Sequence, residues 1–308
     1  MNPVKGIFLK VLSVFVFVMM FSCVKATAEV VPAGEAMFFR SFIAIPVLIG
    51  WLAWRGEFPG RLKAVDPMGH VWRGMMGSCA MGLGFLAVGL LPLPEVVAIG
   101  YTAPFMVTIL AAMFLGERIR LVRFAALLLG LFGVFLVVLP RFTDVDAAAT
   151  TQVQMIGVFA ALMAAVFSAL AQVFARKLVA TESTGAIVFY FSCMSSLLSL
   201  FTLPFGWRVP DFAATGLLVA SGLLGGIGQI LLTESYRHAE VAVIAPFEYS
   251  SILLAVVIGY FIFNEIPTPF MLLGVSLIVI AGVVIILREQ RLGIKGVPRA
   301  KAAVPNQG

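Results

Sequence analysis

EVAVIAPFEYSSILLAVVIGYFIFNE, residues 240–265, is an apolar run of membrane-spanning length that contains a proline and a carboxylate. A helix needs about 20 residues to cross the bilayer core, so a helix that starts near Val241 carries Glu248 about 10 Å into it. An ionised carboxylate there is retained where it faces a partner or a wet cavity. Pro246 removes a backbone donor, and such a break is tolerated beside a cavity. We therefore predict a substrate or proton site at Glu248. The alternative is a protonated acid that hydrogen-bonds a neighbouring helix.

The composition of the whole chain predicts an all-α integral membrane protein. Of 308 residues, 61% are hydrophobic and 12% are charged, whereas soluble domains are about 25% charged. The net charge of +6 is explained by basic cytoplasmic loops, so the lipid bilayer is the expected environment and no nucleic-acid partner is predicted. The hydropathy pattern predicts ten transmembrane helices, at residues 7–27, 36–54, 73–93, 96–115, 123–140, 155–175, 185–206, 213–233, 241–263 and 268–287.

The distribution of basic residues predicts the orientation. With the N-terminus inside, 17 of the 21 Lys and Arg residues fall on the cytoplasmic side, Lys10 and Arg73 among them. The four others are Lys25, Arg40, Arg141 and Arg208. This bias predicts a multi-pass protein of the cell inner membrane with both termini in the cytoplasm. We expect the first helix to remain uncleaved, although its start resembles a signal peptide.

An internal repeat divides the chain. LPEVVAI at Glu95 matches HAEVAVI at Glu240, and a run that ends at Glu117 parallels one that ends at Glu265. Residues 1–142 and 154–287 are therefore predicted to be two five-helix repeats, followed by a basic cytoplasmic tail at 288–308. Because five is odd, the second repeat is inverted. Inverted repeats are typical of secondary transporters, which alternate access around a midplane site.

Several segments carry a family resemblance. RSFIAIP at Arg40, LGER at Glu117 and APFEY at Glu248 resemble the EamA family of the drug/metabolite transporter superfamily, over residues 6–287. EAMFFR, HVWRG and FNEIP look most like the branch for S-adenosylmethionine or riboflavin uptake. The resemblance implies a carrier of a small metabolite. The alternative is an exporter of amino acids or drugs, and family alone does not fix the substrate.

The candidate substrate-binding residues are polar side chains within apolar segments. Gln172 and Gln229 can contact a ligand or join two helices. Tyr101 lies near the repeat counterpart of the Glu248 region. Tyr249 and Tyr236 either bind substrate or anchor their helices at the membrane interface. Arg40, in the first turns of its helix, either meets an anionic substrate group or snorkels to the periplasmic surface, and the second alternative is preferred.

Other function classes find less support in the sequence. There is no phosphate loop and no HExxH pair, and the three cysteines lack metal-ligand spacing. We therefore predict no catalytic residues, no metal and no cofactor. An intramembrane enzyme and an ion channel are the remote alternatives. A proton is the candidate coupling ion, and the last helix of each half is a candidate homodimer surface.

Overall fold

The protein folds as a bundle of helices. The computed structural model describes residues 2–115, 121–140, 148–239 and 241–291, and within these ranges it contains no strand. The helices of the first half are α1 (Pro3–Thr27), α2 (Ala33–Trp54), η1 (Gly60–Leu62), α3 (Pro67–Leu90), α4 (Leu93–Gly100), α5 (Thr102–Leu115) and α6 (Leu121–Val138). Those of the second half are α8 (Ala148–Val179), α9 (Thr184–Leu200), η2 (Leu203–Phe205), α10 (Phe212–His238), α11 (Val241–Ile244), η3 (Ala245–Tyr249), α12 (Ser250–Phe263) and α13 (Pro269–Arg291). Glu117, Glu240 and the tail beyond residue 291, which the sequence predictions used, lie outside the described residues.

The apolar segments match the ten predicted helices. Within the described residues, six helices are long and apolar enough to cross a bilayer. They are accompanied by four shorter apolar helices, at Leu93–Val107, Phe124–Val138, Thr184–Leu200 and Pro269–Ile285. The prediction of an all-α membrane fold is confirmed. The largest difference in bounds is at α8, whose 32 residues extend beyond both ends of the predicted segment 155–175.

Two of the ten segments are interrupted at corresponding places. The fourth breaks at Tyr101, between α4 and α5. The ninth changes from α11 to the 3-10 turn η3 and then to α12, with Pro246 in the first turn of η3. Proline is tolerated at the start of a helical element because its missing N–H has no partner there anyway. The break that Pro246 predicted is therefore present, and it places Glu248 on a tight turn between two helices.

The two interruptions contact each other. The hydroxyl of Tyr101 donates a hydrogen bond to the carbonyl oxygen of Glu248 at 2.6 Å and lies 2.5 Å from the hydroxyl of Ser251. The rings of Tyr101 and Tyr249 stack with centroids 4.7 Å apart. A backbone group freed by a helix break must find a partner inside the protein when it is out of reach of water. Tyr101 supplies a side-chain donor to the η3 turn.

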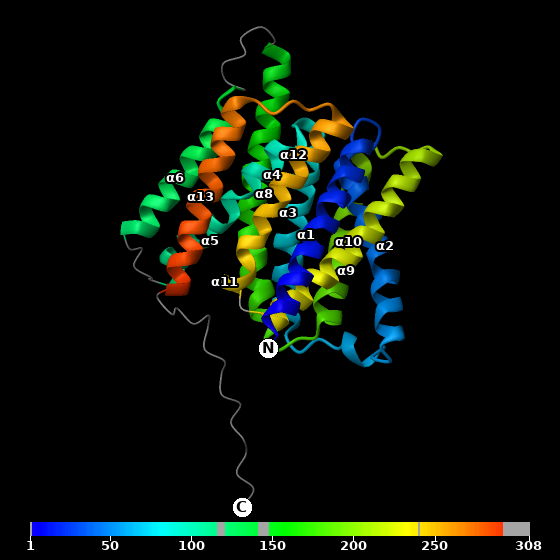
Figure 1. Ribbon diagram of the computed structural model, residues 1–308. Coiled ribbons are helices and arrows are strands. Elements are labelled where there is room, and N and C mark those ends of the chain that lie inside the picture. The colour runs from blue at the N-terminus through cyan, green and yellow to red at the C-terminus, as the bar shows by residue number, and fades with distance from the viewer. Residues whose placement is uncertain (1, 116–120, 141–147, 240, 292–308) are drawn as a thin grey trace, which may run out of the picture.

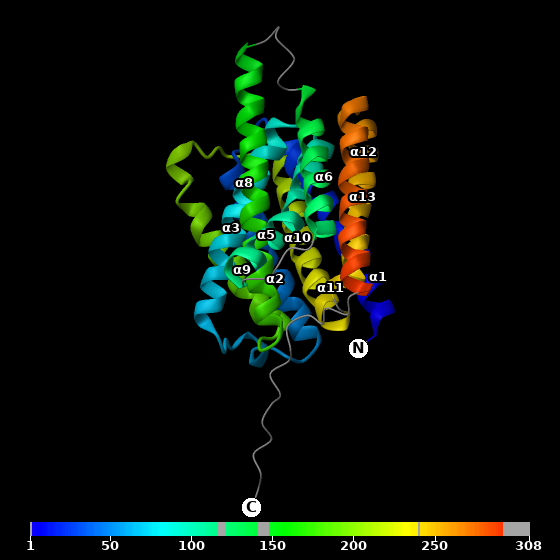
Figure 2. The same cartoon turned by 90° about the vertical axis from the view of Figure 1, so that its left-hand side faces the viewer.

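The packing of the helices has the pattern of a pseudo-two-fold axis. α1 packs along α10, and its counterpart α8 packs along α3. α2 pairs with α9, and α6 pairs with α13. Figures 1 and 2 show that α1 and α8 run in opposite directions. The second half is therefore inverted relative to the first, and the end of α13 returns to the side of the bundle where α1 begins.

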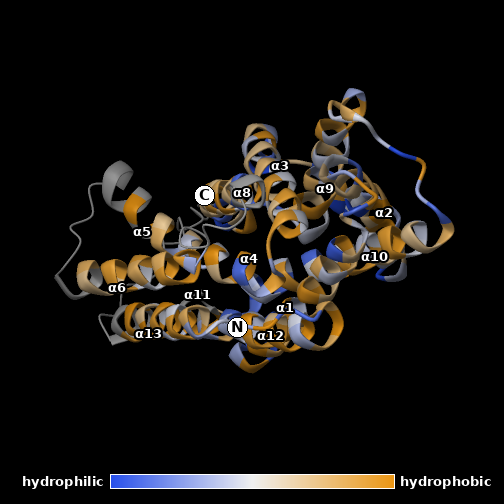
Figure 3. Ribbon diagram, turned by 90° about the horizontal axis from the view of Figure 1, so that it is seen from above, coloured by the Kyte–Doolittle hydropathy of each residue, from blue (hydrophilic) through white to orange (hydrophobic). Residues whose placement is uncertain are grey.

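α6 and α13 form a pair at one edge of the bundle, opposite α2 and α9 (Figure 3). Two glycines face each other in this contact, where a Cβ added at Gly133 would lie 2.7 Å from the carbonyl oxygen of Gly274. A Cβ at Gly274 would in turn overlap the carbonyl oxygen of Gly133. Small residues allow the backbones of membrane helices to approach this closely. The α6–α13 contact therefore depends on both glycines.

We expect Gly274→Ala to destabilise the protein by about 1–3 kcal/mol, because the added methyl group meets backbone atoms that cannot move aside. The matched control is Gly216→Ala in α10, where nothing lies within 4 Å of the added Cβ. This control should be stabilising by up to about 1 kcal/mol from helix propensity. Thermal unfolding of both variants in detergent measures the difference. Equal melting temperatures for the two variants would contradict the packing argument.

The ends of α1, α3 and α12 are joined by an ion pair. Lys25 Nζ lies 2.7 Å from Glu265 Oε1 and donates to the carbonyl oxygen of Leu91 at 2.8 Å, just after the end of α3. Glu265 Oε2 accepts a hydrogen bond from the backbone N–H of Leu93 at 2.9 Å. Asn264, with φ of 54°, ends α12 in the left-handed conformation that terminates many helices. We call Lys25 and Glu265 the closing pair, because together they join α1, the α3–α4 turn and α12.

Candidate functional site

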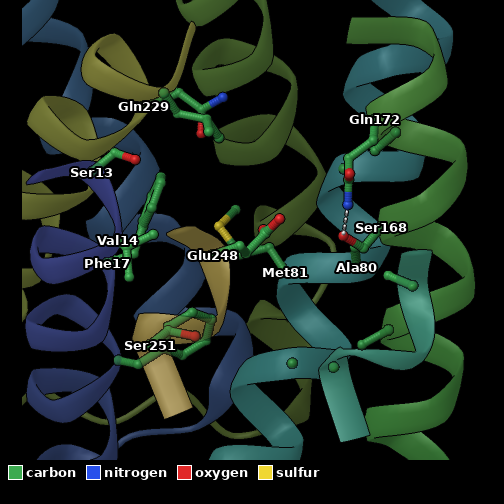
Figure 4. Close-up of a pocket in the computed structure, with 18 of the residues that line it drawn as sticks. Ser13, Val14, Phe17, Ala80, Met81, Ser168, Gln172, Gln229, Glu248 and Ser251 are labelled. Carbon is green, nitrogen blue, oxygen red and sulfur yellow. Dashed lines mark hydrogen bonds between the residues drawn. The ribbon is translucent and has the colours of Figure 1, made fainter. Parts of the chain in front are cut away.

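A cavity of about 380 Å³ lies between the two halves of the bundle. Its lining comes from both halves, and residues of α1, α3, α4, α8, α10 and η3 contribute to it. Figure 4 shows Glu248 between Ser13 and Gln229 on one side and Ser168 and Gln172 on the other. Most of the lining side chains are apolar, with a few polar and charged groups among them. This combination is typical of sites for small organic ligands.

Glu248 forms the centre of the polar part of the cavity. The η3 turn presents its carboxylate to Lys10 of α1, whose Nζ lies 3.4 Å from Glu248 Oε1. The side chain of Lys10 is only 4% exposed, whereas that of Glu248 is 41% exposed. Lys10 Nζ also lies 6.0 Å from the ring centroid of Tyr236. The pair is therefore asymmetric: Lys10 is held inside the protein, and Glu248 remains accessible from the cavity.

The structure brings six of the seven predicted site residues to this cavity. The six are Arg40, Tyr101, Gln172, Gln229, Tyr236 and Glu248. Gln172 Nε2 lies 3.4 Å from Ser168 Oγ, one turn earlier on α8, so this contact lies within its own helix. Tyr249 is not part of the lining, because its ring, which stacks on Tyr101, packs with its hydroxyl end against Gly282 of α13. Tyr249 therefore supports the η3 turn through these contacts.

The preferred interpretation of Arg40 as a snorkelling residue is wrong. Arg40 is 2% exposed and its Nη2 donates to the carbonyl oxygen of Gly225 at 3.3 Å. A Cβ at position 225 would lie 2.7 Å from Arg40 Nε, so the glycine makes room for the guanidinium. α2 begins at Ala33, which places Arg40 about two turns inside the helix. The side chain therefore turns inward to the cavity.

Two further cavity residues were assigned to the cytoplasmic surface by their positions in the sequence. Lys10 and Arg73 are 3% and 7% exposed, and both line the cavity. α1 begins at Pro3 and α3 at Pro67, so both residues lie inside their helices and not at the ends. For Lys10, the sequence did contain a signal, because the apolar residues Ile7, Phe8 and Leu9 precede it.

The charge in the cavity is predominantly positive. Within the described residues, its charged lining consists of Lys10, Arg40, Arg73 and Glu248. Ser13, Ser168, Thr233 and Ser251 add hydroxyl groups. Among the residues that the structure describes, no group of three or more His, Cys, Asp or Glu side chains could hold a metal ion. The site is suited to binding a charged organic molecule through direct hydrogen bonds.

Comparison with known proteins identifies the family. The model of the EamA-like transporter family matches twice, at residues 4–139 and 155–288. The chain belongs to the EamA-like transporter family. The predicted resemblance is thereby confirmed, and this EamA-like protein is a multi-pass membrane transporter, not an enzyme.

Three relatives indicate the range of substrates within the family. The chain is 32% identical to the pseudopaline exporter CntI of Pseudomonas aeruginosa, over 90% of this chain and 94% of the relative. It is 26% identical to the S-adenosylmethionine uptake transporter of Rickettsia bellii, over 83% of this chain and 84% of that one. It is also 26% identical to the riboflavin transporter of Rhizobium johnstonii, over 84% and 83%. The substrates of EamA-like relatives are thus small metabolites.

A crystal structure also shares the fold of this EamA-like protein. It superposes with a TM-score of 0.66 over 93% of this chain and 98% of the other, at 20% sequence identity. At this identity the similarity describes the arrangement of helices alone.

Proposed function

We propose that the protein is a secondary transporter that moves a small organic metabolite across the bacterial inner membrane by alternating access. The observation that carries this proposal is the cavity between the two halves, with the Lys10–Glu248 pair beside the η3 helix break. Broken helices at the interface of inverted repeats form the substrate sites of many secondary transporters. We assign the two repeats to residues 1–142 and 154–287, each supplying part of the cavity lining.

The candidate substrates are S-adenosylmethionine and riboflavin, which relatives are named for carrying. Export is the second candidate direction, supported by the likeness to a pseudopaline exporter. We assign substrate contacts to Arg40, Tyr101, Gln172, Gln229, Tyr236 and Glu248, with Lys10 as the partner of Glu248. Tyr249 has a supporting role in this assignment.

Purified protein reconstituted into liposomes tests the proposal. Labelled S-adenosylmethionine, riboflavin and an amino-acid mixture are supplied outside, with and without an imposed proton gradient. Saturable uptake of an organic solute, absent from empty liposomes, is the expected result. Ohmic current without solute uptake would contradict a carrier mechanism.

We further propose that a proton is the coupling ion and that Glu248 carries it. Partial exposure of this carboxylate to the cavity gives it access to a proton, and Lys10 is its ion-pair partner. Uptake that responds to collapse of the proton gradient is the expected behaviour. A Glu248 variant that retains the wild-type response would contradict this role.

The orientation is a separate prediction. We propose that both termini face the cytoplasm. Lys10, Arg40 and Arg73 are buried, but without them most of the remaining Lys and Arg residues still lie on the predicted cytoplasmic side. A phosphatase reporter that is active only in the periplasm, fused after Gly308, should be inactive. An active reporter, or a mature N-terminus at Glu29, would contradict the orientation or the uncleaved first helix.

A homodimer remains a proposal for the edge formed by α6 and α13. Phe124, Leu128, Phe132 and Phe135 of α6 are each about half exposed on the outer face of this pair. Cross-linking in native membranes, with cysteines placed along this face, is the measurement that distinguishes a second copy from lipid.

A further inference from the structure

Two arginines flank one aromatic ring at the wall of the cavity. Arg40 of α2 and Arg73 of α3 both line the cavity and are 2% and 7% exposed. Their guanidinium carbons lie 5.4 Å and 4.2 Å from the ring centroid of Phe191 in α9. The ring fixes both planar groups by cation–π contact and leaves their N–H donors free to bind elsewhere. Three helices therefore hold two guanidinium groups in a defined arrangement.

The hydrogen-bond donors of these two groups are largely unused. A guanidinium carries five N–H donors and no acceptor. Nε and Nη1 of Arg40 and Nε and Nη1 of Arg73 are buried and have no hydrogen-bond partner. Arg40 Nη2 reaches only the carbonyl oxygen of Gly225. Within the described part of the chain, neither arginine forms an ion pair. By contrast, Lys10, the third buried cation of the cavity, is paired with Glu248.

Buried groups of this kind require a counter-anion. An unpaired buried charge is strongly unfavourable, and a second positive charge nearby adds repulsion. Ring contacts alone do not satisfy the N–H donors of either group. The missing partner is therefore a ligand that enters the cavity. The planar fork of a guanidinium matches a carboxylate with two parallel hydrogen bonds.

We propose that Arg40 and Arg73 form a carboxylate-binding site and that the transported metabolite carries a carboxylate. This inference rests on the proposed transport function and specifies its substrate class. S-adenosylmethionine carries a carboxylate and riboflavin does not, so the site selects for the first kind of molecule. The Glu248 carboxylate, accessible from the same cavity, is placed to bind a cationic group of an amino-acid-like substrate.

An unbiased uptake experiment tests the substrate class without assuming the substrate. Liposomes containing the protein in both orientations are incubated with an isotope-labelled metabolite extract, with and without a proton gradient, and the retained compounds are identified by mass spectrometry. Compounds retained above the level of empty liposomes are expected to carry a carboxylate. Retained compounds that lack one, including phosphate esters, would overturn the inference.

Arginine variants test the two residues directly. Arg40→Gln and Arg73→Gln are each expected to reduce retention at least about tenfold, since charge-assisted hydrogen bonds are lost. Arg40→Lys and Arg73→Lys, which keep the charge but lose the fork, should give intermediate losses. Arg55→Gln is the matched control, because Arg55 lies outside the cavity and pairs with Glu57 at 3.3 Å. Its retention should equal that of the wild type.

The melting temperature of the ligand-free protein distinguishes binding from a structural role. If the arginines await a ligand, Arg40→Gln and Arg73→Gln should melt at or above the wild-type temperature, because an unsatisfied buried charge is removed. A lower melting temperature together with wild-type retention would overturn the inference and leave the transport function standing. Failure of the wild type to retain any compound would instead contradict the transport function itself.

Discussion

Glu248→Gln is expected to abolish most gradient-driven accumulation of substrate, while exchange of substrate across the membrane persists in part. Glutamine keeps the shape of the side chain but cannot bind and release a proton. Ionisable groups inside membrane segments commonly form proton relays in transporters. The two activities are measured in the same proteoliposomes, with a proton gradient for accumulation and with internal substrate for exchange. Wild-type accumulation and pH dependence in Glu248→Gln would show that the carboxylate carries no proton.

The partner of Glu248 provides the control for stability. Glu248→Gln leaves Lys10 buried without a counterion, at 4% exposure of its side chain. We expect a loss of about 1–3 kcal/mol, below the 3–5 kcal/mol of a fully buried pair, because Glu248 is partly exposed. Lys10→Met combined with Glu248→Gln should recover that stability and still fail to accumulate substrate. Normal substrate binding by Glu248→Ala would reduce Glu248 to a structural acid that links η3 to α1.

Glu265→Gln is expected to be strongly destabilising, although Glu265 lies outside the cavity. Both side chains of the closing pair are 15% exposed, with Lys25 Nζ and Glu265 Oε1 2.7 Å apart. Breaking it leaves a poorly solvated ammonium beside the end of α3, at an expected cost of about 2–4 kcal/mol. Unfolding of the purified protein in mixed micelles measures this cost.

Glu57→Gln is the matched control for the closing pair. Glu57 Oε1 lies 3.3 Å from Arg55 Nη2, and Glu57 Oε2 lies 3.8 Å from Arg61 Nε. These three side chains are more exposed than those of the closing pair. Such surface pairs contribute about 0–1 kcal/mol, so this variant should unfold close to the wild type. Similar stability losses for Glu57→Gln and Glu265→Gln would contradict the assignment of the closing pair as a structural joint.

The fold was largely predictable from the sequence because hydrophobic length is a strong signal in membrane proteins. A bilayer requires every spanning backbone to form its hydrogen bonds internally, so each apolar run must be a helix. The break at Pro246 was predictable for the same reason, since a proline within such a run removes a donor. The repeat around Glu95 and Glu240 predicted the inverted arrangement, which the opposite directions of α1 and α8 confirm.

The site was only partly predictable, because hydropathy does not give the depth or the direction of a side chain. Arg40, Lys10 and Arg73 lie near the ends of their apolar runs in the sequence, yet their helices extend past them and bury them. Tyr249 shows the problem of direction. It follows Glu248 directly on the η3 turn, but neighbouring residues on a helical turn point to different sides, and its ring packs against Gly282 of α13 instead of lining the cavity.

The contact between α6 and α13 bears on which helices keep their neighbours during the proposed alternating-access cycle. In an alternating-access cycle that exchanges the conformations of the two repeats, the α1–α10 contact takes the geometry of the α8–α3 contact, and the reverse. The same exchange keeps α6 beside α13, because each of these helices is the counterpart of the other. We therefore expect α6 and α13, which touch at Gly133 and Gly274, to stay together through the cycle. A covalent link across α6 and α13 is therefore expected to be compatible with turnover.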